Sequence, residues 1–119
     1  MIHWQVEARK LGVVITCRGH DKERQVEAAV SAFDELMRKQ TAPLTVIADL
    51  KEMTGYESSS RVAWQVVFKR HRKLMQRLIL VGARSKMIRM GAAVVGAFAA
   101  VPVVFVETWS DLQSLERSA

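Results

Sequence analysis

The start of the chain shows the two-residue period of β-strands. Polar and apolar side chains alternate over residues 3–8, and residues 13–17 form a second run that is rich in β-branched side chains. The segment Lys10-Leu11-Gly12 between them suits a turn. We therefore predict a hairpin of two strands at the N-terminus.

The rest of the chain alternates between helical patterns and short apolar runs. Apolar side chains in residues 21–39 recur at the spacing of one helix face, and Trp64, Val67, Phe68 and Leu74 share a face of a second helix. Further helices are expected over 85–99 and 108–115, strands over 44–48, 78–82 and 101–106, and one long loop over 49–60. The expected N-caps are Asp21, one of Ser58, Ser59 and Ser60, then Ser85 and Thr108.

The segment from Met90 to Val106 has no charged residue and must be tested as a membrane span. Its 17 residues reach only the lower limit for a helix that crosses a bilayer. Gly91, Gly96 and Pro102 interrupt it, and its second part is dense in Val and Phe. This composition favours a buried helix followed by a buried strand.

The resulting order, ββαβαβαβα, defines an α/β fold. Alternation of strands with helices predicts a mostly parallel five-stranded sheet, made mixed by the initial hairpin, with about four helices. The length of 119 residues fits one domain, residues 1–119. The carboxyl ends of parallel strands are where ligands usually bind in such sheets.

Charge is distributed unevenly along the chain. The formal net charge is +6, and from Arg61 to Arg89 there are nine basic residues and no carboxylate. Such a segment favours an anionic partner, such as nucleic acid, a lipid head group, a phosphate or an acidic protein, although it is also typical of a solvated surface. The basic cluster over 69–73 lacks an aromatic platform, so specific nucleic-acid recognition is not expected.

Signatures of catalysis are mostly absent from the sequence. It has no GxxxxGK[ST], GxGxxG or GxSxG motif, and its three His and one Cys show no metal-ligand spacing, so we expect no enzyme, metal or cofactor. Cys17 lies in an expected strand and fits a buried apolar role better than that of a nucleophile. His71 has only cationic neighbours along the chain, which favours a surface or interface role. The lone Cys also suits a reducing compartment, and we expect a cytoplasmic protein without a secretory signal.

One segment carries a family resemblance. The expected strand ends at Asp49-Leu50, and Glu57-Ser58-Ser59 opens the next helix. In this order and in the length of its elements the chain resembles the STAS domains, specifically the SpoIIAA-like branch related to bacterial anti-sigma factor antagonists. Those antagonists carry Asp-Ser-Ser-Gly or a close variant at this place, whereas Glu57 and Ser60 stand here at the first and last positions.

The resemblance implies a site and a function. In the antagonists the serine after the acidic residue accepts a phosphate, which makes Ser58, with Ser59 beside it, the phosphorylation candidate. Residues of the same loop and of the next βα loop would contact a partner or an anion, unless the serines are only helix caps and the cations are solvated. These expected contact residues are Tyr56, Glu57, Arg84, Ser85, Lys86 and Arg89.

We therefore expect a non-enzymatic bacterial signalling module that binds a protein partner, either an anti-sigma factor or a related kinase, under control of serine phosphorylation. The alternative is a domain that binds a small apolar or anionic, lipid-like molecule, since the SpoIIAA-like proteins resemble Sec14-type lipid carriers in topology. In that case the helix over 87–99 would act as a mobile lid, and Arg84, Lys86 and Arg89 would hold an anionic head group. A symmetric homodimer is also compatible with the sequence.

Overall fold

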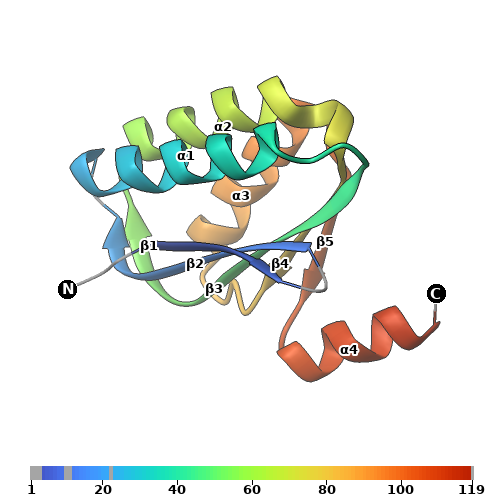
Figure 1. The fold of residues 1–119 in the computed structure, drawn as a ribbon. Helices are drawn as coiled ribbons and strands as arrows, with labels where there is room; N and C mark the ends of the chain where they lie inside the picture. The colour runs from blue at the N-terminus through green and yellow to red at the C-terminus, as the bar shows by residue number, and fades with distance from the viewer. Residues whose placement is uncertain (1–3, 10–11, 22, 119) are drawn as a thin grey trace.

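A single mixed sheet organises the chain, with helices on both of its faces (Figure 1). The computed structural model describes residues 4–9, 12–21 and 23–118. The strands lie side by side in the order in which they occur along the chain. They are β1 (Trp4–Arg9), β2 (Gly12–Asp21), β3 (Leu44–Tyr56), β4 (Met75–Val81) and β5 (Val103–Val106).

The strand directions confirm the predicted hairpin and parallel sheet. β1 pairs antiparallel with β2, while β2, β3, β4 and β5 run parallel to one another. The crossovers between the parallel strands contain α1 (Glu23–Arg38), α2 (Ser58–His71) and α3 (Lys86–Ala99), and α2 continues into the short 3-10 helix η1 (Arg72–Leu74). α4 (Trp109–Ser118) follows β5. The order ββαβαβαβα is therefore confirmed.

Alternation along the strands divides the apolar residues between two cores. In β2, Val13 and Ile15 face one core while Val14 faces the other. The larger core lies under α1, α2 and α3, where Phe33, Trp64 and Phe68 pack with ring centroids 5.2–5.9 Å apart. The three large helices thus cover one face of the sheet (Figure 1).

The opposite face of the sheet is covered by α4. Leu112 is fully buried there against Val14, Ile47 and Ile79. The indole Nε1–H of Trp109 donates a hydrogen bond of 2.8 Å to Oδ2 of the buried Asp49. An apolar contact and a buried polar contact therefore hold this helix against the sheet.

The prediction of a long loop over 49–60 is wrong. β3 continues to Tyr56, because its second half pairs with the end of β2 through two shifts of register, and only Glu57 separates it from α2. The exposed Lys51, Glu52 and Thr54 gave this half a polar sequence. It lies beyond the end of β4, where one side of the strand is no longer covered by a neighbour.

The helix starts correct one of the predicted caps and agree with another in its position. Ser58, Ser59 and Ser60 lie inside the first turn of α2, and the N-cap is Glu57, whose side chain makes no capping hydrogen bond. Ser85 is the N-cap of α3 but also makes no side-chain capping bond.

The predicted cap at Thr108 is confirmed, because Thr108 and Asp111 exchange reciprocal backbone-to-side-chain bonds as in a capping box. The side chain of Asp21, also predicted as a cap, lies outside the described residues.

The uncharged segment over 90–106 forms most of α3 and then β5, as predicted. The expectation that the helix is buried is only half right, because Met90, Val94 and Phe98 on its outer side are exposed. Among the described residues, no helix combines the length and the apolar character that crossing a bilayer would need.

Candidate functional site

The junction between β3 and α2 places the predicted phosphate acceptor on the surface. Ser58 and Ser59 are exposed at the first turn of α2, whereas Ser60 is only 1 % exposed. The carbonyl of Glu57 accepts the backbone N–H groups of Ser60 and Arg61. The first N–H groups of any helix lack intrahelical acceptors, so a negative group at Ser58 would meet the positive end of the helix dipole.

The predicted cations of the second βα loop are exposed as well. Arg84, Ser85 and Lys86 lead into α3, while Arg89, one turn on, lies over the ring of Phe105 at 4.6 Å. Among the described residues, no hydrogen bond or ion pair joins Ser58 or these cations to one another. Their joint contact with one phosphate or one acidic side chain stays a prediction.

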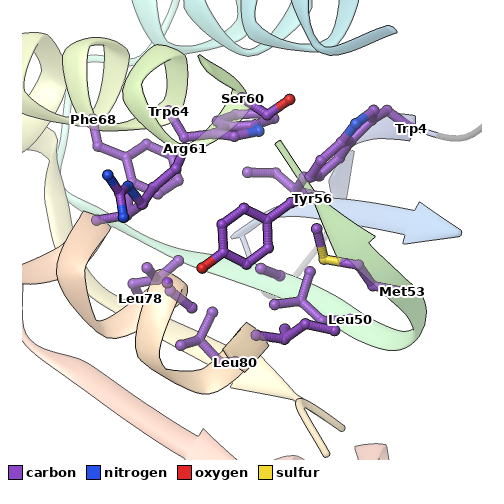
Figure 2. Close-up of a pocket in the computed structure, with 16 residues that line it drawn as sticks. Trp4, Leu50, Met53, Tyr56, Ser60, Arg61, Trp64, Phe68, Leu78 and Leu80 are labelled. Atoms are coloured by element: carbon purple, nitrogen blue, oxygen red, sulfur yellow. The ribbon is translucent and has the colours of Figure 1, made fainter. Parts of the chain in front are cut away.

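Tyr56 connects the two junctions. Its hydroxyl donates a hydrogen bond of 3.2 Å to the carbonyl of Met87 in the first turn of α3. Its ring lies so close to Gly91 that a Cβ at that position would stand 2.3 Å from the hydroxyl oxygen. Tyr56 was predicted as a contact residue, and the structure places it half-buried between the end of β3 and α3 (Figure 2).

A surface that the sequence analysis missed runs along α2 and α3, which pack side by side. We call it the α2–α3 surface, and it consists of the exposed apolar side chains of Val62, Val66, Met87, Met90, Val94 and Phe98. At its far end the Nζ of Lys69 lies 5.0 Å from the centre of the Phe98 ring. No Asp or Glu occurs from Ser58 to Val106, so the charges of both helices are all positive. A surface that is apolar and cationic suits a binding partner that is apolar and acidic.

Beneath this surface lies an apolar cavity of about 70 Å³ between the sheet, α2 and α3 (Figure 2). Ser60, Arg61 and Trp64 line it from α2, and Tyr56 lines it from the end of β3. The buried Oγ of Ser60, Nε of Arg61 and Nε1 of Trp64 have no hydrogen-bond partner among the described residues. Its other walls include Trp4, Leu50, Leu80, Ile88 and Val95.

Of the surface or interface role predicted for His71, the surface role is wrong. Its side chain is 9 % exposed, and its ring Nε2 lies 2.6 Å from Oδ1 of Asp34 on α1. Arg38 and Arg70 pair with the same carboxylate at 2.9 and 3.1 Å. These contacts, led by the hydrogen bond from His71, lower the pKa of Asp34 from 3.8 to about 2. The carboxylate comes from a residue 37 positions away, which no local pattern could indicate.

The chemistry available elsewhere in the described residues is limited. No group of three His, Cys, Asp or Glu side chains in this part of the chain is arranged to hold a metal ion. Cys17 is fully buried in β2, as predicted for a cysteine that packs like a small apolar residue.

Comparison with known proteins identifies solved structures that have a similar fold. Neither a protein-family model nor a curated protein sequence matches the chain. Among solved structures, an uncharacterised protein of the DUF3478 family with a SpoIIAA-like fold, from Shewanella loihica PV-4, matches with a TM-score of 0.71 at 14% identity over 94% of this chain and 90% of that chain.

A second match is the anti-sigma factor antagonist SpoIIAA in its unphosphorylated form. Its TM-score is 0.68 at 21% identity, over 98% of this chain and 99% of that one. The chain therefore has a SpoIIAA-like fold, and the resemblance found in the sequence is confirmed at the level of the fold.

Proposed function

We propose that this chain is a non-enzymatic regulatory module that binds a protein partner through the first turn of α2 and the α2–α3 surface. The observation that carries the proposal is the α2–α3 surface itself. Val66 is 49% exposed, Met90 is 67% exposed and Phe98 is 49% exposed, although such side chains are usually buried. Six exposed apolar side chains on two helices that pack together favour an interaction site, because monomeric proteins rarely expose large apolar patches.

The charge around this surface indicates the character of the partner. Lys69 lies against the apolar residue Phe98, Arg84 and Lys86 are exposed at the start of α3, and neither helix has a carboxylate. Complementary charge speeds association and selects the partner more than it adds affinity. We infer an acidic protein surface with an apolar centre, and the anti-sigma factor class is the natural candidate because SpoIIAA, with the same fold, is an anti-sigma factor antagonist.

Phosphorylation of Ser58 would act as the switch. The hydroxyl is exposed at the helix start, next to Val62 one turn further along α2. A phosphate adds about −1.5 to −2 charges at neutral pH. The helix terminus would favour it by about 0.3–1 kcal/mol, and Glu57 would oppose it. Charge of this size facing an acidic partner would break the complex, so we expect binding only by the unphosphorylated form.

The direct experiment uses any anti-sigma kinases that the genome encoding this chain contains. Each is purified, mixed with the chain and a nucleotide, and tested for complex formation by calorimetry and for phosphate transfer by intact-mass spectrometry. We expect one kinase to form a complex and to transfer a single phosphate, and Ser58→Ala to abolish the transfer. Ser58→Asp should weaken the complex at least tenfold.

Two matched pairs of variants test the site rather than the fold. Val66→Asp should abolish binding, while Ala28→Asp on the exposed side of α1 should leave it unchanged. Ser31→Asp, also on α1, is the control for Ser58→Asp. The proposal would be contradicted if no complex forms. It would also be contradicted if Val66→Asp and Ser58→Asp bind the kinase as strongly as the wild type does.

A further inference from the structure

The cavity between the sheet, α2 and α3 carries an inference about how a partner is held (Figure 2). We infer that it receives a single aliphatic side chain, that of valine, leucine or isoleucine, from an acidic segment of the partner. This rests on the proposed function, which makes the α2–α3 surface a docking surface. What it adds is the chemistry of the residue that anchors the complex.

The position of the cavity connects it with the α2–α3 surface. It is open to solvent on one side, and the half-buried residues Tyr56, Arg61 and Ala92 are part of its lining. Two residues of the α2–α3 surface are sequence neighbours of the lining, because Val62 directly follows one lining residue and Met87 directly precedes another. A side chain from a partner that sits on this surface can therefore enter the cavity.

The lining of the cavity selects an apolar side chain. It is almost entirely apolar, and its walls include Leu50, Leu80, Ile88 and Val95. A polar group placed there would lose its hydrogen bonds to water without gaining others, which is unfavourable. An aliphatic group would bury apolar surface on both sides of the contact, which is favourable.

The size of the cavity selects among the apolar side chains. Its volume of about 70 Å³ is roughly half that of an apolar protein cavity that holds benzene, which is about 150 Å³. This space suits about three or four carbon atoms, as in valine, leucine or isoleucine, whereas the ring of phenylalanine is too large.

The rim of the cavity is already formed in the free chain. The hydroxyl of Tyr56 donates its hydrogen bond of 3.2 Å to the carbonyl of Met87, and its ring packs closely on Gly91. A pocket that needs no rearrangement loses less free energy on binding. Side chains that fill such pockets near the centre of an interface contribute most of its binding energy.

The charge beside the cavity defines the residues on either side of the anchor. Arg84 and Lys86 are exposed at the start of α3, next to the turn whose carbonyl is bonded to Tyr56. No Asp or Glu occurs from Ser58 to Val106. Carboxylates that flank the anchor would be attracted by these cations, whereas lysines there would be repelled. The segment is therefore an aliphatic residue between acidic ones.

Short synthetic peptides test the pocket without a natural partner. In three of them acidic residues flank a central leucine, alanine or phenylalanine, and in a fourth lysines flank leucine. Methyl signals of Ile88, Ala92 and Val95 are followed by ¹H–¹³C NMR, with Val104 on the opposite face of the sheet as reference. We expect the acidic leucine peptide, added to about 10 mM, to shift the cavity signals in a saturable manner, with a Kd on the order of 1 mM. The alanine and phenylalanine peptides should bind roughly tenfold more weakly or worse, and the lysine peptide should not bind.

Two cavity variants change its size in opposite directions. Ala92→Leu fills the cavity and should abolish binding of the leucine peptide, whereas Ala28→Leu, at an exposed position of α1, should leave it unchanged. Val95→Ala enlarges the cavity and should reverse the preference, so that the phenylalanine peptide binds more tightly than the leucine peptide. The methyl spectrum shows that each variant is folded.

The outcomes distinguish the pocket from the proposed function. Binding of the leucine peptide, with no complex of any anti-sigma kinase, would support the pocket and contradict the choice of partner. A kinase complex whose affinity is unchanged in Ala92→Leu would overturn the pocket and leave the proposed function intact. The pocket would also be overturned by unshifted cavity signals, by equal affinity for the alanine and leucine peptides, or by an unchanged preference in Val95→Ala.

Discussion

The carboxylate of Asp34 joins α1 to the end of α2 through hydrogen bonds. Removal of its charge gives a quantitative test of this contact. It accepts hydrogen bonds from the buried His71 on α2 and from Arg38 and Arg70, and these lower its pKa from 3.8 to about 2. Asp34→Asn keeps the shape of the side chain and removes the charge. We expect this variant to be less stable than the wild type at neutral pH.

The pKa gives the size of the effect. One pKa unit corresponds to about 1.4 kcal/mol, so the lowering is worth at most about 2.5 kcal/mol. Arg38 and Arg70 are more than half exposed, and water and salt screen their share. We therefore expect a loss of about 1–2 kcal/mol, which lowers the Tm of a domain of this size by about 3–8 °C.

The pH dependence distinguishes this mechanism from a general loss of packing. A carboxylate whose pKa is lowered in the folded state stabilises the fold when the pH is above its unfolded-state pKa, near 4. This stabilisation is lost as the pH falls through the folded-state pKa of about 2. The Tm difference between wild type and Asp34→Asn should therefore be constant above about pH 5 and shrink between pH 4 and 2.

Thermal unfolding by circular dichroism measures this difference, with Glu35→Gln, at the exposed neighbouring position, as the control. Equal Tm values for wild type and Asp34→Asn at neutral pH, or a Tm difference that does not change in acid, would show that the charge of Asp34 does not stabilise the fold.

Three further substitutions test local features of the fold. Ala100 caps α3 in the left-handed region at φ 59°, so Ala100→Gly should stabilise the protein by about 1 kcal/mol in urea unfolding, and a loss of stability would contradict this. Leu112→Ala should cost about 2–5 kcal/mol, visible as a lower urea midpoint, because Leu112 is fully buried between α4 and the sheet; a cost below 1 kcal/mol would mean that α4 does not depend on it. Gly12 has φ 141°, and a Cβ there would stand 2.0 Å from the carbonyl oxygen of Thr45. Gly12→Ala should therefore destabilise the protein by more than about 2 kcal/mol. A melting curve identical to that of the wild type would show that the hairpin can shift without cost.

The order of elements could be predicted because each element carries its own periodic pattern. The β-branched run of β2 and the helical spacing of α1 are local signals, and both elements lie where they were expected. The second half of β3 could not be predicted from a periodic pattern. Its exposed residues Lys51, Glu52 and Thr54 are polar, and it is a strand because it pairs with the end of β2. A pairing between segments more than thirty residues apart leaves no local trace.

The candidate site was predictable only where it follows from the resemblance. Ser58 was identified through the neighbouring residues that carry the family resemblance. Its exposure at the start of α2 agrees with a role as phosphate acceptor but does not test that role. The α2–α3 surface was missed because Val66, Met90 and Phe98 have the same character as the core positions of their helices. Which apolar side of a helix remains uncovered depends on how many helices pack on the sheet, and this is a property of the tertiary structure.

The location of the proposed docking site can be measured directly by hydrogen–deuterium exchange of the chain with and without the anti-sigma kinase that the proposal expects to bind it. We expect slower exchange in the first turns of α2 and along α3, with α1 and α4 unchanged. Protection confined to α1, β1 or α4, with α2 and α3 exchanging as in the free protein, would contradict the claim that the α2–α3 surface binds the partner.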